Sequence, residues 1–239
     1  MFSRVKFAGK AALDTARPVF ENRISSVVEL CKDKNVLDLG CTQHRMLGQE
    51  VEIENWLHWR IKQVASSLVG VDYLQDEVDR LNKKGFNIVC SNVYDLHPDH
   101  IHLEKIDVIV CGELIEHLPN PGTFLMTVKK LMTENSILVI TTPNAYDLHR
   151  MNLMLRKRYE DQWLNKEHKC WYTFNTLMQL LEFCGFAEVQ WGYYGGRKAP
   201  VTFLKRRIHA LKKRFNYKHI SQVELSEGLF FVSKAKSLE

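Results

Sequence analysis

Short apolar runs alternate with amphipathic segments from residue 35 onward, and this alternation restricts the fold more than any other feature. Each run has the length of one strand, and the apolar positions between the runs recur at helical spacing. The alternation predicts an α/β fold in which helices cover both faces of a largely parallel sheet. The expected strands are Val36–Leu39, Leu68–Val71, Asn87–Cys90, Ile106–Cys111, Ile137–Thr141, Ala187–Tyr193 and Gly228–Val232.

The segments between these strands predict four helices, and the residues before the first strand predict one or two more. The four helices are expected over Trp56–Ser67, Gln75–Lys83, Pro121–Met132 and Thr173–Cys184. Residues 1–34 end in the helical pattern ISSVVELCK, so we interpret them as an N-terminal helical extension. No repeat or linker interrupts the rest, and we therefore expect residues 35–239 to form a single domain.

The composition is that of a globular protein: 45% of the 239 residues are hydrophobic and 26% are charged. This excludes disordered, collagen-like and disulfide-rich classes. The six cysteines form no CxxC pair and several lie in apolar runs, so we expect reduced, packed thiols and no cysteine zinc site. The N-terminus has no signal-peptide core and no window is long enough to span a bilayer, which indicates a cytoplasmic protein.

Polar residues and glycines follow the expected strands at the positions where a ligand would bind. In open α/β sheets, ligands bind outside the carboxyl ends of the strands. The first strand leads into Asp38, Gly40 and the residues after them, the second ends at Asp72, and the third is followed by Asn92. A carboxylate such as Asp72 can accept hydrogen bonds from both hydroxyls of a ribose, and the amide of Asn92 can bind an adenine edge.

Several of these stretches match known sequence motifs. They are VLDLGC, GVDY, IDVIVCGELIEHLPNPGTFL, TPNAY and EHKCWYTFNTLMQLLEFCGF. With them, residues 35–192 resemble the class I S-adenosylmethionine-dependent methyltransferases. The resemblance implies a Rossmann-like, doubly wound sheet of seven strands whose last strand is antiparallel.

The same resemblance implies a binding role for each residue at the strand ends. Asp38 and Gly40 belong to the first cofactor motif, in which Gly40 lets the methionyl part of S-adenosylmethionine approach the backbone. Asp72 would bind the ribose, Asn92 would lie at the adenine, and Gly112 would lie beside the sulfonium.

The first motif departs from the family pattern. Thr42-Gln43-His44 stand where the family usually has further glycines, and 32 residues separate Gly40 from Asp72, against the roughly 20 of nucleotide-binding units. We expect insertions near 43–66, 146–168 and 195–220, the last two forming a small substrate cap. The helix in the first insertion resembles that of a methyltransferase subfamily associated with bacterial glycan assembly. The missing glycines favour another alternative, in which the chain is a catalytically silent partner subunit that binds the cofactor.

Glu113, Glu116 and His117 share one face if a helical turn follows the fourth strand. Together with His168 they predict a site for Mg²⁺, Mn²⁺ or Fe²⁺. GELIEHL followed by a later histidine resembles both small-RNA 2′-O-methyltransferases and the enzymes that methylate catechol hydroxyls of quinone precursors. The alternatives are that Glu116 and His117 serve as helix caps, or that one of them is the catalytic general base without a metal.

The leading prediction is therefore O-methylation of a small molecule or a saccharide, with RNA 2′-O-methylation as the alternative. Segment 203–218 is basic and amphipathic, and its pattern fits either a packed helix with a charged face or a weak contact with an anionic membrane or RNA. The second reading would place this cytoplasmic protein at the membrane periphery. The net charge of +5 permits such a contact, and we expect no DNA partner.

Overall fold

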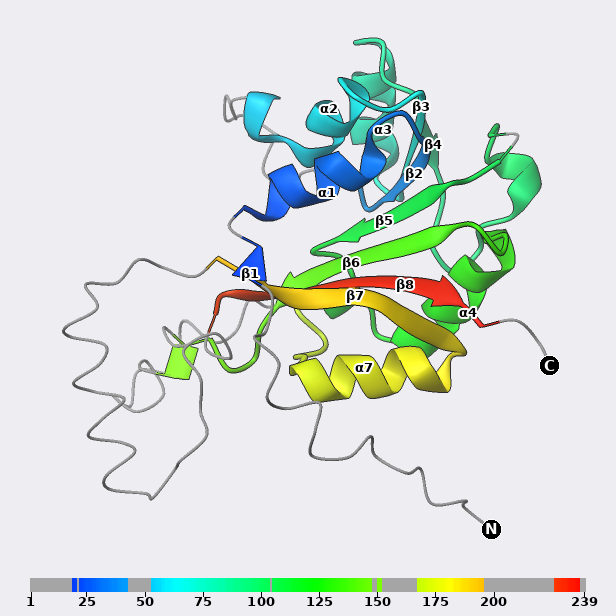
Figure 1. The fold of residues 1–239 in the computed structure, drawn as a ribbon. Coiled ribbons are helices and arrows are strands. Elements are labelled where there is room, and N and C mark those ends of the chain that lie inside the picture. The colour runs from blue at the N-terminus through cyan, green and yellow to red at the C-terminus, as the bar shows by residue number, and fades with distance from the viewer. Residues whose placement is uncertain are drawn as a thin grey trace, which may run out of the picture.

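The strands form one mixed sheet in the computed structural model (Figure 1), which describes residues 19–20, 22–42, 53–103, 105–147, 150–151, 167–195 and 226–236. Their order is β1-β7-β8-β6-β5-β2-β3-β4. Strand β8 runs antiparallel to β6 and β7, and all other neighbours are parallel. The bounds are β1 Val19–Phe20, β2 Asn35–Leu39, β3 Ser67–Asp72, β4 Ile88–Cys90, β5 Val108–Gly112, β6 Ile137–Pro143, β7 Phe186–Tyr194 and β8 Gly228–Ala235.

Strands β2 to β8 confirm the predicted seven-stranded, Rossmann-like sheet with its antiparallel last strand. The two-residue β1 is an addition, and it lies where a helix was expected. Val19 and Phe20 pair with the edge of β7, and the Phe20 ring stacks on Phe230 at a centroid distance of 4.2 Å. A strand of two residues shows no periodicity, so the sequence did not reveal this contact with residues distant in the chain.

Helices cover both faces of the sheet, as predicted. Helices α1 and α2 pack on one face, and α4 and α7 pack on the other (Figure 1). The α-helices are α1 Arg23–Cys31, α2 Leu57–Lys62, α3 Gln75–Asn82, α4 Pro121–Leu131 and α7 Phe174–Phe183. Short 3₁₀ turns lie at η2 Ile53–Asn55, η3 Pro98–His100 and η4 Ile115–His117.

The central strands are apolar throughout because both of their faces are buried. In β2, Val36 packs with α1 and α2, whereas Leu37 and Leu39 pack in the core beneath α4 and α7. Asp38 is the one polar side chain of β2 that points to the α1–α2 face and is buried there. Its burial requires a partner, which the next subsection identifies.

The strand order places a switch point beside β2. The chain leaves β2 toward β3 and β4, then returns to the other side of β2 to form β5. The crossovers therefore diverge at the carboxyl ends of β2 and β5, which opens a crevice at that edge. This is the edge at which the sequence placed the cofactor residues.

Four predicted features lie partly or wholly outside the described residues: the N-terminal extension up to residue 18, residues 43–52 of the expected insertion near 43–66, most of the expected substrate cap, and the whole basic segment 203–218. In the part of the chain that the structure describes, no helix is both long and apolar enough to cross a bilayer. All six cysteines are described and none forms a disulfide, and four of them are buried, in line with packed thiols.

Candidate active site

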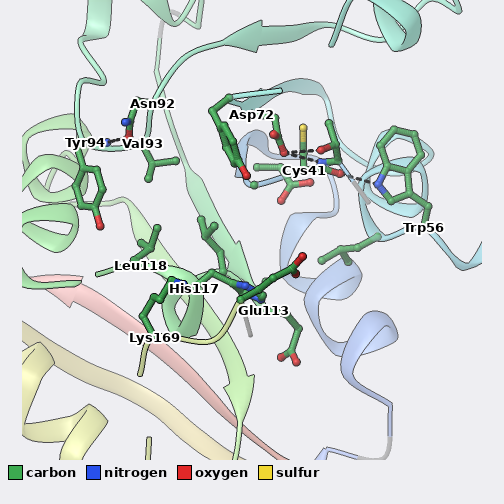
Figure 2. A pocket seen from close by; sticks show the side chains of 18 of the residues that line it. Cys41, Trp56, Asp72, Asn92, Val93, Tyr94, Glu113, His117, Leu118 and Lys169 are labelled. Atoms are coloured by element: carbon green, nitrogen blue, oxygen red, sulfur yellow. Dashed lines mark hydrogen bonds between the residues drawn. The ribbon is translucent and has the colours of Figure 1, made fainter. Parts of the chain in front are cut away.

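A cavity of about 550 Å³ opens at the carboxyl ends of β2, β3, β4 and β5 (Figure 2). All five residues assigned to the cofactor line it: Asp38, Gly40, Asp72, Asn92 and Gly112. Figure 2 shows Asp72 and Asn92 across the cavity from Glu113 and His117. Residues from elements far apart in the sequence therefore form the two opposite walls of one polar groove.

Asp72 is held by donors from two segments. Its Oδ2 accepts hydrogen bonds from the backbone N (3.0 Å) and the hydroxyl (2.7 Å) of Thr42, and its Oδ1 accepts one from Leu74 N (3.2 Å). Asn92 is also partly engaged, because its Oδ1 accepts a hydrogen bond from Tyr94 N at 3.1 Å. The Asn92 amide therefore presents its NH₂ group to a ligand more readily than its oxygen.

Helix α2 and the residue before it contact the first motif. Trp56 donates its indole N–H to Cys41 O at 2.7 Å, and His58 Nδ1 donates to Asp38 Oδ2 at 2.9 Å. Both side chains are almost fully buried. Gly40 has a φ of +66°, and a Cβ there would lie 2.8 Å from a methyl carbon of Leu114, so no larger residue fits without displacement. The helical pattern of NWLHW predicts the helix but not which loop it contacts.

Glu113 does not join the predicted group of metal ligands. Its Oε1 accepts a hydrogen bond from the Tyr194 hydroxyl at 2.5 Å, which directs the carboxylate toward β7. Burial, and then the nearby Glu113 charge, raise the pKa of Tyr194. Glu113 also has a φ of +56°, a conformation that costs a residue other than glycine about 1–3 kcal/mol and recurs at functional sites.

Glu116, His117 and His168 do come together, with one potential ligand atom from each within 4.8 Å of the others. The predicted helical turn exists as η4, but only two of its three candidates point to this group. Glu116 is 2% exposed, and Thr142 donates to its Oε2 at 3.0 Å. Among the described residues, neither Oε1 of Glu116 nor the buried Nδ1 of His168 has a hydrogen-bond partner. His117 lines the cavity, and the other two lie behind it.

Backbone contacts hold this group in place. The N–H groups of Lys169 and Cys170 donate to Glu116 O at 2.7 and 3.0 Å, which fixes residues 169–170 to η4. The His168 ring stands edge-on to His117 and to Trp171, at centroid distances of 4.7 and 4.9 Å. Burial, and then the neighbouring His117, lower the pKa of His168 to about 4, so this imidazole is neutral at pH 7 and has a lone pair available.

Burial and the neighbouring Glu113 carboxylate raise the pKa of Glu116 to about 8. In the native protein this carboxyl group is therefore largely protonated at neutral pH. In that form it can donate one hydrogen bond.

The family follows from the sequence comparison. Residues 16–190 match the family described as "Methyltransferase domain". The chain belongs to this family. The predicted class, an S-adenosylmethionine-dependent methyltransferase, is thereby confirmed, and the comparisons do not favour a silent partner subunit or an RNA 2′-O-methyltransferase.

Individual relatives of this methyltransferase agree with the match. This chain is 32% identical over 159 residues to a ubiquinone biosynthesis O-methyltransferase of Glaesserella parasuis. These residues make up 63% of this chain, and the chain spans 63% of that protein's length. A protein of the same name from Neisseria meningitidis is 22% identical over 180 residues, covering 72% of this chain and 70% of that one. An S-adenosylmethionine-dependent methyltransferase structure from Archaeoglobus fulgidus has the same fold, with a TM-score of 0.63 at 18% identity over 89% of this chain and 91% of that one.

The raised pKa of Glu116 gives this methyltransferase a testable pH dependence of stability. Between its ordinary value of 4.5 and about 8, the unfolded chain is ionised at this residue while the native chain is protonated. The free energy of unfolding should therefore fall as pH rises through this range, by at most about 1.4 kcal/mol per pH unit. Glu116→Gln stays neutral and should lose this part of the slope. Urea unfolding at pH 5, 7 and 9 with a chelator present measures it, and the exposed Glu134→Gln is the matched control. Equal slopes in wild type and Glu116→Gln would contradict the assignment.

Proposed function

We propose that this methyltransferase transfers a methyl group from S-adenosylmethionine to a hydroxyl oxygen of a small-molecule acceptor. The observation that carries the proposal is the position of His117, which lines the same cavity as Asp72 and Asn92 but on the opposite wall. A hydroxyl nucleophile must lose a proton, and this wall holds the groups able to take it. The two relatives named as O-methyltransferases support oxygen as the acceptor atom.

The cavity fits the cofactor. Its volume of about 550 Å³ lies within the roughly 300–1,000 Å³ of small-molecule sites. Asp72 would hold the ribose and the Asn92 amide the adenine. At the other end Arg23, which the sequence did not single out, lines the cavity near Gly112 and would hold the carboxylate of the cofactor's amino-acid part. When bound, the cofactor supplies a methyl group already activated on a sulfonium.

The protein therefore contributes alignment and proton removal. Alignment of nucleophile and methyl group can supply about 7–11 kcal/mol of the barrier reduction. His117 is the histidine of its group that lines the cavity, so it is placed to accept the acceptor's proton. Glu116 lies behind it, with Oε1 4.0 Å from His117 Nε2, and limits the positions that the imidazole can adopt.

The second candidate for activating the acceptor hydroxyl at this wall is a divalent cation held by Glu116, His117 and His168. The unpartnered Glu116 Oε1 and His168 Nδ1 favour it, because buried polar atoms are rarely left without a partner. With Glu113 bonded to Tyr194, the set has two imidazoles and one carboxylate, which suits Mn²⁺ or Fe²⁺ better than Mg²⁺. When bound, the cation would lower the pKa of the acceptor hydroxyl.

Removal of metal distinguishes a bound cation from His117 acting as the base alone. If the cation is used, EDTA should reduce turnover at least tenfold and Mn²⁺ should restore it. His168→Ala should then weaken Mn²⁺ binding in a calorimetric titration while the affinity for S-adenosylhomocysteine stays within about twofold. Full turnover in EDTA would exclude the cation and leave His117 as the base.

The acceptor is tested with a panel of hydroxyl compounds and labelled S-adenosylmethionine. We propose a phenolic or catechol hydroxyl, since GELIEHL followed by His168 resembles the enzymes that methylate catechol hydroxyls of quinone precursors, and the two relatives are named ubiquinone biosynthesis O-methyltransferases. Saccharides form the second arm of the panel, because the inserted helix resembles one in glycan-associated enzymes. Transfer to nitrogen or carbon, or to no member of the panel by a protein that binds the cofactor, would contradict the proposal.

A further inference from the structure

The Asp72 carboxylate has little free hydrogen-bonding capacity. A carboxylate offers about four lone-pair positions, two on each oxygen. Among the described residues, the N–H and the hydroxyl of Thr42 occupy both positions on Oδ2, and Leu74 N–H occupies one on Oδ1. One position on Oδ1 remains for a ligand.

This arrangement is fixed rather than adaptable. Asp72 is 2% exposed and Thr42 is 6% exposed, so both side chains are packed on every side except the one that faces the cavity. The loop that carries Thr42 is tied to β3, because Gly40 N and Cys41 N donate to Val71 O at 2.8 and 3.2 Å. Both donors of Thr42 therefore point at Asp72 Oδ2. A glycine at this position would supply the N–H but no hydroxyl.

We propose that Thr42 is a specificity-determining residue that restricts Asp72 to one hydroxyl of the cofactor ribose. Asp72 Oδ1 accepts that hydroxyl, and the other hydroxyl makes no hydrogen bond to this carboxylate. This inference rests on the proposed use of S-adenosylmethionine. It replaces the expectation that Asp72 accepts hydrogen bonds from both hydroxyls.

The test compares S-adenosylhomocysteine with its 2′-deoxy and 3′-deoxy analogues by calorimetric titration. With the wild-type protein, one analogue should bind at least about tenfold more weakly and the other within about threefold of the parent compound, because a hydrogen bond to a charged group is lost only in the first. Thr42→Val removes the hydroxyl and opens a position on Oδ2. The analogue that wild type tolerates should then bind about tenfold more weakly than the parent. Thr42→Ser keeps the hydroxyl and should keep the wild-type pattern.

The outcomes separate the inference from the function on which it depends. Equal weakening of both analogues in wild type overturns the inference alone, and so does a Thr42→Val protein with the wild-type pattern. Failure of wild type to bind S-adenosylhomocysteine overturns the proposed function. If Thr42→Val does not fold, as judged by circular dichroism, the wild-type comparison of the two analogues decides by itself.

Discussion

Replacing His117 with alanine is expected to lower kcat by about 10²–10⁴-fold, the usual contribution of a positioned proton acceptor. The same loss is expected if His117 holds a cation, because that cation would supply the acidity of the acceptor hydroxyl. His117 lies across the cavity from Asp72 and Asn92, so the Kd for S-adenosylhomocysteine should change less than threefold. Single-turnover kinetics and calorimetric titration measure the two quantities separately.

The matched control for His117 is His102→Ala, which removes an exposed histidine outside the cavity. It should leave both kcat and cofactor affinity unchanged. A His117→Ala protein with kcat within threefold of wild type would remove this residue from the chemistry. A parallel loss of cofactor affinity and kcat would instead assign it to cofactor binding.

The fold could be predicted from the sequence because the information is local. Each central strand is buried on both faces and therefore reads as an unbroken apolar run, while the helices α3, α4 and α7 have clear helical periodicity. The strand-end rule then places Gly40, Asp72, Asn92 and Gly112 at one edge without knowledge of any side-chain contact. The short β1 escaped prediction because two residues carry no periodicity.

The contacts that refine the site could not be predicted, since each joins segments far apart in the sequence. Tyr194 lies 81 positions after Glu113 and draws its carboxylate away by a hydrogen bond. No local pattern indicates that a tyrosine in β7 will reach the end of β5. The spacing of Glu113, Glu116 and His117 predicts one shared face only for a regular helix. The positive φ of Glu113 and the 3₁₀ geometry of η4 break that regularity and leave two of the three together with His168.

The missing glycines of the first motif are explained by the same kind of contact. Thr42 donates a hydrogen bond to Asp72, Trp56 just before α2 donates one to the Cys41 carbonyl, and His58 of α2 donates one to Asp38. At the start of this loop, where the family pattern has glycines, residues 40–42 are held by buried hydrogen bonds. Pre-organisation of this kind lowers the entropic cost of binding. A glycine-poor motif is therefore compatible with full cofactor affinity.

Removing the charge of Asp72 is expected to produce the largest loss of cofactor affinity. A hydrogen bond to a charged group is worth about 1.5–3 kcal/mol, so Asp72→Asn should raise the Kd for S-adenosylhomocysteine roughly tenfold to a hundredfold. Asparagine is preferable to alanine, because it keeps one acceptor oxygen, whereas alanine would leave all the buried donors of Thr42 and Leu74 without an acceptor and destabilise the protein more. Asp95→Asn, at an exposed aspartate outside the cavity, is the control and should bind normally. Thermal unfolding of each variant shows whether a loss of affinity comes from the site or from the fold. An Asp72→Asn protein that is folded and has an unchanged titration curve would remove Asp72 from the cofactor site, and with it the restriction that Thr42 places on the ribose.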